Sequence, residues 1–131
     1  MLGMKKWPGF LPTNHFLFRI EYAVLCIGLL MALHWRALSG GLDLGLTLLF
    51  LLLPDAPFLA ILPALKRNGK DAGIWPSWGV FAYNVTHSYV TWMLLVGLAW
   101  HFAVIPWWPL LGAFLHVSID RAIGFSLRTR Q

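Results

Sequence analysis

The sequence has little of what a soluble enzyme or a secreted protein needs. Only 11% of its 131 residues are charged, and it contains a single cysteine. Because Cys26 lies alone in an apolar run, a disulfide framework and a cysteine-based metal site are both excluded. The sequence also lacks internal repeats, low-complexity tracts and a glycine-rich phosphate loop. Hydrophobic residues make up 59% of the chain, which is too apolar for an ordinary soluble domain and predicts an integral membrane protein.

Several apolar runs approach the length of about 20 residues that a helix needs to cross a bilayer. We expect residues 1–131 to form one domain of the all-α class, a four-helix transmembrane bundle. Its spans are predicted at about 15–38, 42–65, 79–101 and 107–127. The second run contains Pro54, Pro57 and Pro63, which remove backbone donors and predict a kink or break near Asp55.

The positions of lysine and arginine predict the orientation of the bundle. They occur at both ends of the chain and in the loop 66–78, and are nearly missing from the other two loops. Cytoplasmic loops carry the excess of these residues, so we expect both termini and the loop 66–78 to be cytoplasmic. The net charge of +5 is interpreted as this topological signal, and no nucleic-acid-binding surface is predicted.

The last apolar run, in the stretch 114–125, is interrupted by ionisable side chains. His116 and Asp120 are four residues apart, and Gly112 and Gly124 continue the same spacing. These residues share one face of a helix. Ionisable groups inside a span are costly and usually face the bundle interior or a water-filled cavity. The pair is therefore a candidate site, with a structural His–Asp hydrogen bond as the alternative interpretation.

Other embedded polar residues fall at a similar depth. At about 1.5 Å per helical residue, Asp55, His87 and Asp120 lie roughly 12–16 Å from the predicted cytoplasmic edge, and His116 about 18 Å. Glu21 and Asn84 belong to the same layer. Because four separate spans contribute to this layer, we expect one shared site.

Two imidazoles and two carboxylates form a ligand set for a divalent ion such as Zn or Mn, which could activate water. The predicted metal ligands are Asp55, His87, His116 and Asp120. The predicted catalytic set adds Asn84, which would orient the site, and Arg121, which would hold an anionic group. Two other interpretations stay open: charge pairing of the carboxylates by Arg19 or Arg121, and a proton or ion path.

The order of these motifs resembles the DUF4260 family of small bacterial membrane proteins, whose function is unknown. The shared pattern is Arg19-Ile20-Glu21, Leu53-Pro54-Asp55, Tyr83-Asn84-x-x-His87-Ser88-Tyr89 and His116-x-x-x-Asp120-Arg121-x-x-Gly124. It covers roughly residues 17–128. The chain departs from the family at Tyr22, where the family has glycine, and at its C-terminal segment. The resemblance implies a multi-pass protein of the bacterial inner (plasma) membrane.

A looser resemblance bears on chemistry. Pro54-Asp55, Thr86-His87-Ser88 and His116-x-x-x-Asp120 are similar, in the same order, to motifs of proteins regarded as metal-dependent hydrolases of the bacterial inner membrane. That group has a second Asp and a further His where this chain has Pro57 and Tyr83 or Asn84. The resemblance implies metal-dependent hydrolysis at the cytoplasmic side, on a lipid-linked substrate. The alternatives are a non-enzymatic accessory or structural subunit, and a small transporter or proton path. A homo-oligomer or a larger membrane complex is compatible with each of them.

Overall fold

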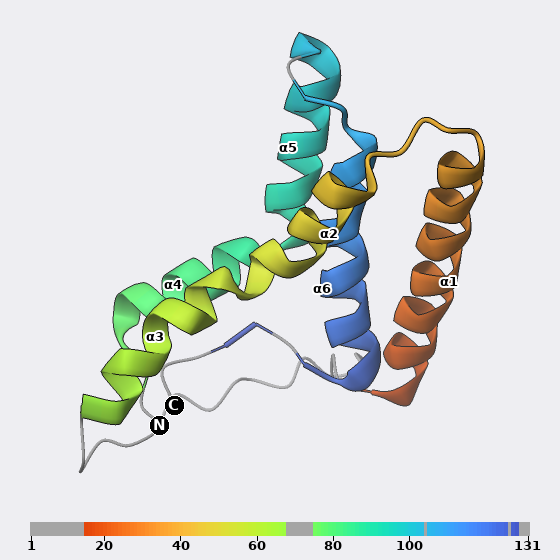
Figure 1. Cartoon of the computed structure of the whole chain (residues 1–131). Helices are drawn as coiled ribbons and strands as arrows, with labels where there is room; N and C mark the ends of the chain where they lie inside the picture. Colours follow the sequence, from red (N-terminus) through yellow and green to blue (C-terminus); the bar gives the residue numbers. More distant parts are fainter. Residues whose placement is uncertain (1–14, 68–74, 104, 126, 129–131) are drawn as a thin grey trace.

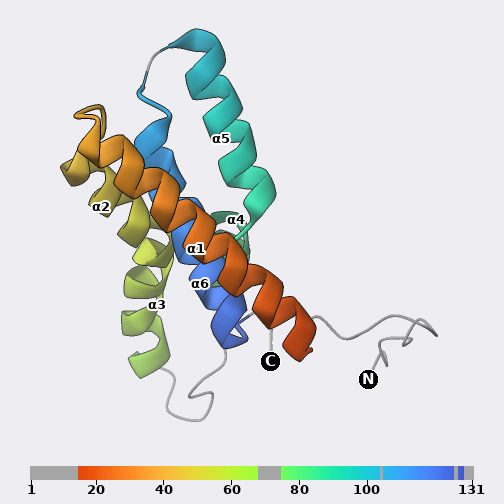
Figure 2. The ribbon, with the colours of Figure 1, turned by 90° about the vertical axis from the view of Figure 1, so that its right-hand side faces the viewer.

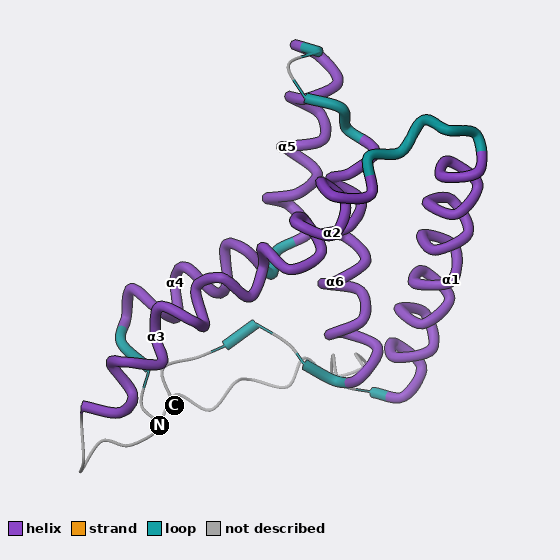
Figure 3. Tube along the Cα trace, viewed as in Figure 1, coloured by secondary structure: helices purple, strands orange, loops and turns teal. Residues whose placement is uncertain are grey.

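The computed structural model describes residues 15–67, 75–103, 105–125 and 127–128 (Figure 1). Most of these residues are helical and none lies in a strand (Figure 3), which confirms the predicted all-α class for this part of the chain. The elements are α1 (Phe16–Leu38), α2 (Leu44–Leu52), the 3₁₀ turn η1 (Leu53–Asp55), α3 (Ala56–Arg67), α4 (Ser77–Thr86), α5 (Tyr89–Phe102), the 3₁₀ turn η2 (Trp108–Leu110) and α6 (Leu111–Ile123). The two termini and most of the polar loop 66–78 lie outside the described residues, so their predicted cytoplasmic location stays a prediction.

Two helical stretches are long and apolar enough to cross a membrane. They are Phe16–Leu38 and Leu44–Pro63, each with a mean hydropathy of 2.0. Only 11% of each apolar window is buried, whereas the core helix of a soluble protein is mostly buried. The other two predicted spans contain shorter helices: α5 has 14 residues and α6 has 13.

The second of these stretches is interrupted at its proline-rich centre. Leu53–Asp55 forms η1 between α2 and α3, and Pro54 is fully buried there. Pro54 and Pro57 have no backbone N–H, so the regular helical hydrogen bonds are lost at this point. The break predicted near Asp55 is confirmed, and it leaves Asp55 at the end of the turn.

The third predicted span, 79–101, is not one continuous helix, and the prediction was wrong in this respect. α4 ends at Thr86 and α5 begins at Tyr89, with His87 and Ser88 between them. Neither proline nor glycine marks this break. The hydroxyl of Thr86 lies within hydrogen-bond distance of two carbonyl oxygens in the last turn of α4. Such contacts compete with the regular backbone pattern.

Helix α6 packs against α1 and α2 and also contacts α5. Figures 1 and 2 both show α1 and α6 side by side. Gly112 permits a close approach to α2, because a Cβ atom at this position would overlap the backbone carbonyl of Thr47. Gly124 ends α6 with a φ of 101°, which suits glycine. The helix therefore stops at Ile123, earlier than the predicted 127.

Three apolar clusters hold the elements together. The first joins α5, η2 and α6, the second joins α1 and α6, and the third joins α3, Trp75 and α4. In Figure 1 the α3–α4 pair extends away from α1 and α6. The turn η1 contacts both α4 and α6. The two helix breaks, at Asp55 and at His87, therefore lie where the α3–α4 pair meets α6.

Candidate functional site

The side chains of Asp55, His87, His116 and Asp120 come together and are called the His/Asp cluster below. Nε2 of His87 lies 3.4 Å from Oδ1 of Asp55 and 3.3 Å from Oδ2 of Asp120. Nε2 of His116 lies 3.4 Å from the same Asp55 oxygen and 3.6 Å from the same Asp120 oxygen. Each of the two carboxylate oxygens therefore faces both ring nitrogens. η1, the α4–α5 break and α6 supply these residues.

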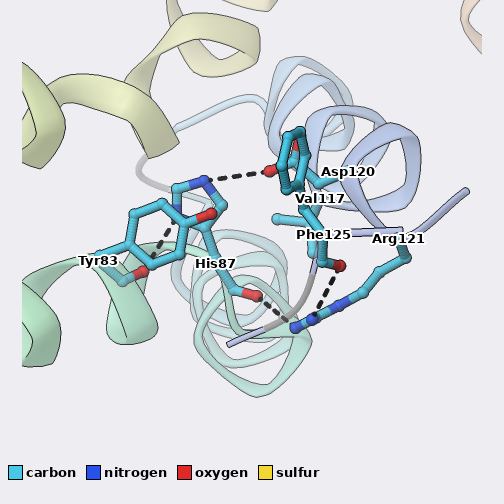
Figure 4. A pocket seen from close by; sticks show the side chains of 6 residues that line it. All are labelled: Tyr83, His87, Val117, Asp120, Arg121 and Phe125. Atoms are coloured by element: carbon cyan, nitrogen blue, oxygen red, sulfur yellow. Dashed lines mark hydrogen bonds and ion pairs between the residues drawn. The ribbon is translucent and has the colours of Figure 1, made fainter. Parts of the chain in front are cut away.

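The backbone of α4 determines how His87 presents its ring. Nδ1 of His87 lies 2.9 Å from the carbonyl oxygen of Tyr83. Because a carbonyl oxygen only accepts, Nδ1 carries the proton of this bond. The imidazole also stacks on the ring of Tyr83, with 3.7 Å between the centroids. In the neutral ring, Nε2 is then the nitrogen with a free lone pair, and it points at Asp120 in Figure 4.

Both Nε2 atoms of the cluster are buried, and neither has a hydrogen-bond partner among the residues that the structure describes. The side chain of His87 is only 3% exposed and that of His116 is 14% exposed. The separations between these nitrogens and the carboxylate oxygens exceed the usual 2.7–3.2 Å of an N–H···O hydrogen bond. A buried polar atom without a partner costs about 1–3 kcal/mol, so these nitrogens are expected either to bind a further group or to carry protons and pair with the carboxylates.

No arginine or lysine of the described residues balances the two carboxylates. The ion pairs of Asp55 and Asp120 in this part of the chain are with the two histidines. Arg121 follows Asp120 directly, yet its guanidinium donates to the carbonyl oxygen of His87 at 3.3 Å and to a second backbone carbonyl (Figure 4). Arg19 likewise donates to a backbone carbonyl of α6. The interpretation in which these arginines pair with the carboxylates does not fit this geometry.

Asn84 is a predicted site residue that lies apart from the cluster. Its Nδ2 donates to the carbonyl oxygen of Arg128 at 2.9 Å, and its Oδ1 accepts from the N–H of Arg128 at 2.8 Å. Both ends of the amide are therefore engaged with the backbone at residue 128. Glu21, assigned to the same layer by depth, is exposed on α1 and makes none of the contacts that define the cluster.

Thr86 is a site-forming residue that spacing alone did not identify. Its hydroxyl lies 2.9 Å from the carbonyl oxygen of Pro54, so it joins the end of α4 to η1. The indole N–H of Trp92 donates to the carbonyl oxygen of Thr86 at 2.7 Å, which ties the start of α5 to the same point. The available signal was the Thr-His-Ser order, in which Thr86 directly precedes His87.

An open cleft of about 230 Å³ lies against the cluster. Its lining includes both carboxylates, four aromatic side chains and one cation: Asp55, Phe58, Trp75, Tyr83, Asp120, Phe125 and Arg128. The guanidinium of Arg128 lies over the ring of Trp75, 4.2 Å from its centroid. The two acidic members of the cluster therefore border a space that a small molecule can enter.

The cluster contains donors suited to a divalent ion. Asp55, His87 and His116 each offer one ligand atom, and these atoms lie within 4.8 Å of one another. Donors bound at about 2.0–2.1 Å around a tetrahedral ion are separated by about 3.3–3.4 Å. The nitrogen–oxygen separations of 3.3–3.6 Å are close to this value. Asp120 contacts both rings and is placed to serve as a fourth ligand or as a base.

Comparisons of the chain with protein-family models, curated proteins and solved structures give no match. The two resemblances described from the sequence therefore stay predictions. What the protein does has to be inferred from the chemistry of its own residues.

Proposed function

We propose that this protein is a multi-pass membrane protein with four spans and both termini on the cytoplasmic side. Two apolar stretches with mostly exposed surfaces support this proposal, because a soluble monomer rarely exposes large contiguous apolar patches. Tryptophans from three segments also meet at one end of the bundle, in the order Trp35, Trp108, Trp107 and Trp100. Such aromatic groups are typical of a membrane interface. The sequence resemblance suggests the bacterial inner membrane.

We propose further that the His/Asp cluster binds one divalent ion, Zn or Mn. One observation carries the proposal: two buried Nε2 atoms without hydrogen-bond partners face carboxylate oxygens that no arginine or lysine of the described residues balances. A divalent cation would neutralise both carboxylates and accept both nitrogen lone pairs. The hydrogen bond from His87 Nδ1 to the Tyr83 carbonyl is the outer contact that typically orients a metal-binding imidazole.

Metal-dependent hydrolysis is the reaction that this arrangement supports best. Asp55, His87 and His116 would be the ligands, which leaves a position for water, as catalytic zinc sites require. A bound divalent ion lowers the pKa of a water ligand into the neutral range. Oδ2 of Asp120 lies 3.3 Å from Nε2 of His87 and 3.6 Å from Nε2 of His116. Asp120 would accept the proton of that water. The adjoining cleft gives a substrate access to this position.

The second candidate function is that of a non-enzymatic accessory subunit, in which the cluster only fixes helix packing. The same separations, all below 4.0 Å, also suit ion pairs between protonated imidazoles and carboxylates. In that case the cluster would join η1, α4 and α6 without any ion.

Elemental analysis of detergent-purified protein distinguishes the two functions. We expect about one Zn or Mn per chain in the wild type and a loss of this metal in His116→Ala. His101→Ala is the matched control, because His101 is an exposed histidine at the end of α5. Wild-type protein without stoichiometric metal would overturn the hydrolase proposal and favour the accessory subunit.

A further inference from the structure

We infer that the cleft beside the His/Asp cluster binds the phosphate group of an amphiphilic phosphoester, and that Arg128 is the residue that binds this group. The inference rests on the proposed metal site and names the substrate class that the site would take.

Arg128 is a cation that is held in place without an acidic partner among the described residues. Its backbone is fixed by the two hydrogen bonds with the side chain of Asn84. Its guanidinium lies 4.2 Å from the centroid of Trp75 and 5.8 Å from that of Tyr83. Within the described residues, no carboxylate lies within ion-pair distance of this group. The donors of the guanidinium that are not covered by the rings are available to an oxyanion.

The charge of the cleft favours an anion only when the metal is bound. Asp55 and Asp120 line the cleft together with Arg128, which gives these three side chains one net negative charge. A divalent ion reverses this balance to one net positive charge. Metal and anion binding should therefore be coupled, and by linkage each should strengthen the other. Phosphate oxygens fit both a divalent ion and a guanidinium.

The shape and surface of the cleft indicate an amphiphile. About 230 Å³ is smaller than the roughly 300–1,000 Å³ of pockets that enclose a whole drug-sized ligand. The cleft would therefore hold a head group and leave an attached chain outside. Phe58 and Phe125 on its lining are 38% and 56% exposed, and the neighbouring Leu59 is 67% exposed. These exposed apolar groups offer a path for an alkyl chain toward the bilayer.

Hydrolysis of such an ester balances without another reactant. The oxygen of water forms a bond to phosphorus, and the bond between phosphorus and the ester oxygen breaks. Asp120 would take one proton from the water and pass it to the leaving alcohol oxygen. Arg128 would hold the remaining phosphate oxygens together with a bound ion.

The test measures binding of defined probes to zinc-loaded, full-length protein in neutral dodecyl maltoside micelles. The probes are dodecyl phosphate, inorganic phosphate and the uncharged dodecanol. Isothermal titration calorimetry measures the affinity for each probe. Arg128→Gln removes the charge but keeps the backbone that Asn84 holds, and Arg128→Lys restores the charge. Arg36→Gln is the matched control, because the guanidinium of Arg36 lies over Trp108, outside the cleft lining.

We expect Arg128→Gln to weaken dodecyl phosphate binding about tenfold or more, Arg128→Lys to recover part of it, and Arg36→Gln to behave as wild type. Removal of zinc should abolish binding of this probe, and dodecanol should not bind in the cleft.

Equal binding by wild type and Arg128→Gln would overturn the role of Arg128. Inorganic phosphate binding as tightly as dodecyl phosphate would overturn the amphiphile and favour a soluble phosphoester. A wild type that binds neither zinc nor manganese, seen before any probe is added, would overturn the proposed function and this inference with it.

Discussion

The hydroxyl of Thr86 lies 2.9 Å from the carbonyl oxygen of Pro54, and this contact joins the two broken helices of the structure. Thr86 is the last residue of α4 and is followed by His87, whereas Pro54 lies in η1 and is followed by Asp55. A single hydrogen bond between the residues that precede His87 and Asp55 therefore helps to set the distance between these two members of the His/Asp cluster. Two interruptions that are 32 residues apart in sequence form one structural unit.

Removing the Thr86 hydroxyl should loosen this unit. Thr86→Val keeps the shape of the side chain but loses the hydrogen bond to Pro54. We expect the affinity for zinc to fall about 10–100-fold, as for other contacts that orient metal ligands. The free energy of unfolding should fall by about 0.5–1.5 kcal/mol. Zinc titration and thermal unfolding check both values, with Thr91→Val in α5 as the control. Equal zinc affinities in the two variants would contradict this role of Thr86.

The two carboxylates of the cluster should respond differently to neutralisation. Asp55→Asn removes a proposed ligand, so its loss of zinc affinity should exceed the about 10–100-fold of an outer contact. Asp120→Asn removes the proposed base, so zinc should still bind while hydrolysis of a phosphoester probe falls about 10²–10⁴-fold. Zinc titration and a phosphate-release assay measure the two effects. If Asp120→Asn loses zinc as fully as Asp55→Asn, Asp120 is a ligand and not a free base.

Acid and chelator should act alike if the cluster binds a metal. Protons compete with the ion for the imidazole nitrogens, so metal occupancy and thermal stability should fall as the pH drops through the histidine range. A chelator at neutral pH should lower the melting temperature in the same way. The accessory-subunit alternative predicts the opposite sign, because a pair between imidazolium and carboxylate persists at mildly acidic pH and weakens as the pH rises. Identical melting curves with and without chelator would exclude the metal.

Gly112 should be intolerant of a side chain, unlike another glycine within a helix. In Gly112→Ala the new Cβ would overlap the backbone of α2 at Thr47, and backbone cannot move as a flexible side chain does. We expect a loss of about 1–3 kcal/mol in the free energy of unfolding, typical of overpacking. Gly97→Ala in α5 meets nothing within 4 Å and should be neutral or stabilising by up to about 1 kcal/mol. Thermal or denaturant unfolding in detergent compares them, and similar losses would argue against the close α2–α6 contact.

Cysteine labelling tests the proposed orientation. Cys26 is buried, so new cysteines report their own positions. A cysteine at Ser39, in the turn after α1, should react with a membrane-impermeant reagent in intact cells. A cysteine at Lys70 should react only after the membrane is opened, because the loop 66–78 is predicted to be cytoplasmic. Reaction of both positions from the same side would rule out the four-span arrangement.

The parts that the sequence predicts well depend on local chemistry. The break at Asp55 was predictable because prolines remove backbone donors wherever they occur. The grouping of His87 with His116 and Asp120 was predictable because a helix rises by a fixed amount per residue, so residues on different predicted spans can be compared by their expected depth.

The parts that the sequence predicts poorly depend on tertiary contacts. The break after Thr86 has no proline or glycine, and it is stabilised by a hydroxyl that bonds to a distant turn. Asn84 lies three residues before His87 and was expected to orient the site. Its amide nevertheless holds Arg128, because the segment after Gly124 reaches that face of α4. Only the path of that segment determines this contact.

The location of two cluster residues on α6 has a consequence for how the protein is made. A ribosome completes α2, η1 and α4 well before it synthesises His116 and Asp120. Until α6 is made, Asp55 and His87 lack two of the groups that surround them in the finished protein. A chain interrupted before Leu111 would keep both apolar candidate spans and still leave these polar groups incompletely partnered. Completion of the C-terminal helix is therefore also the step that supplies the last two members of the His/Asp cluster.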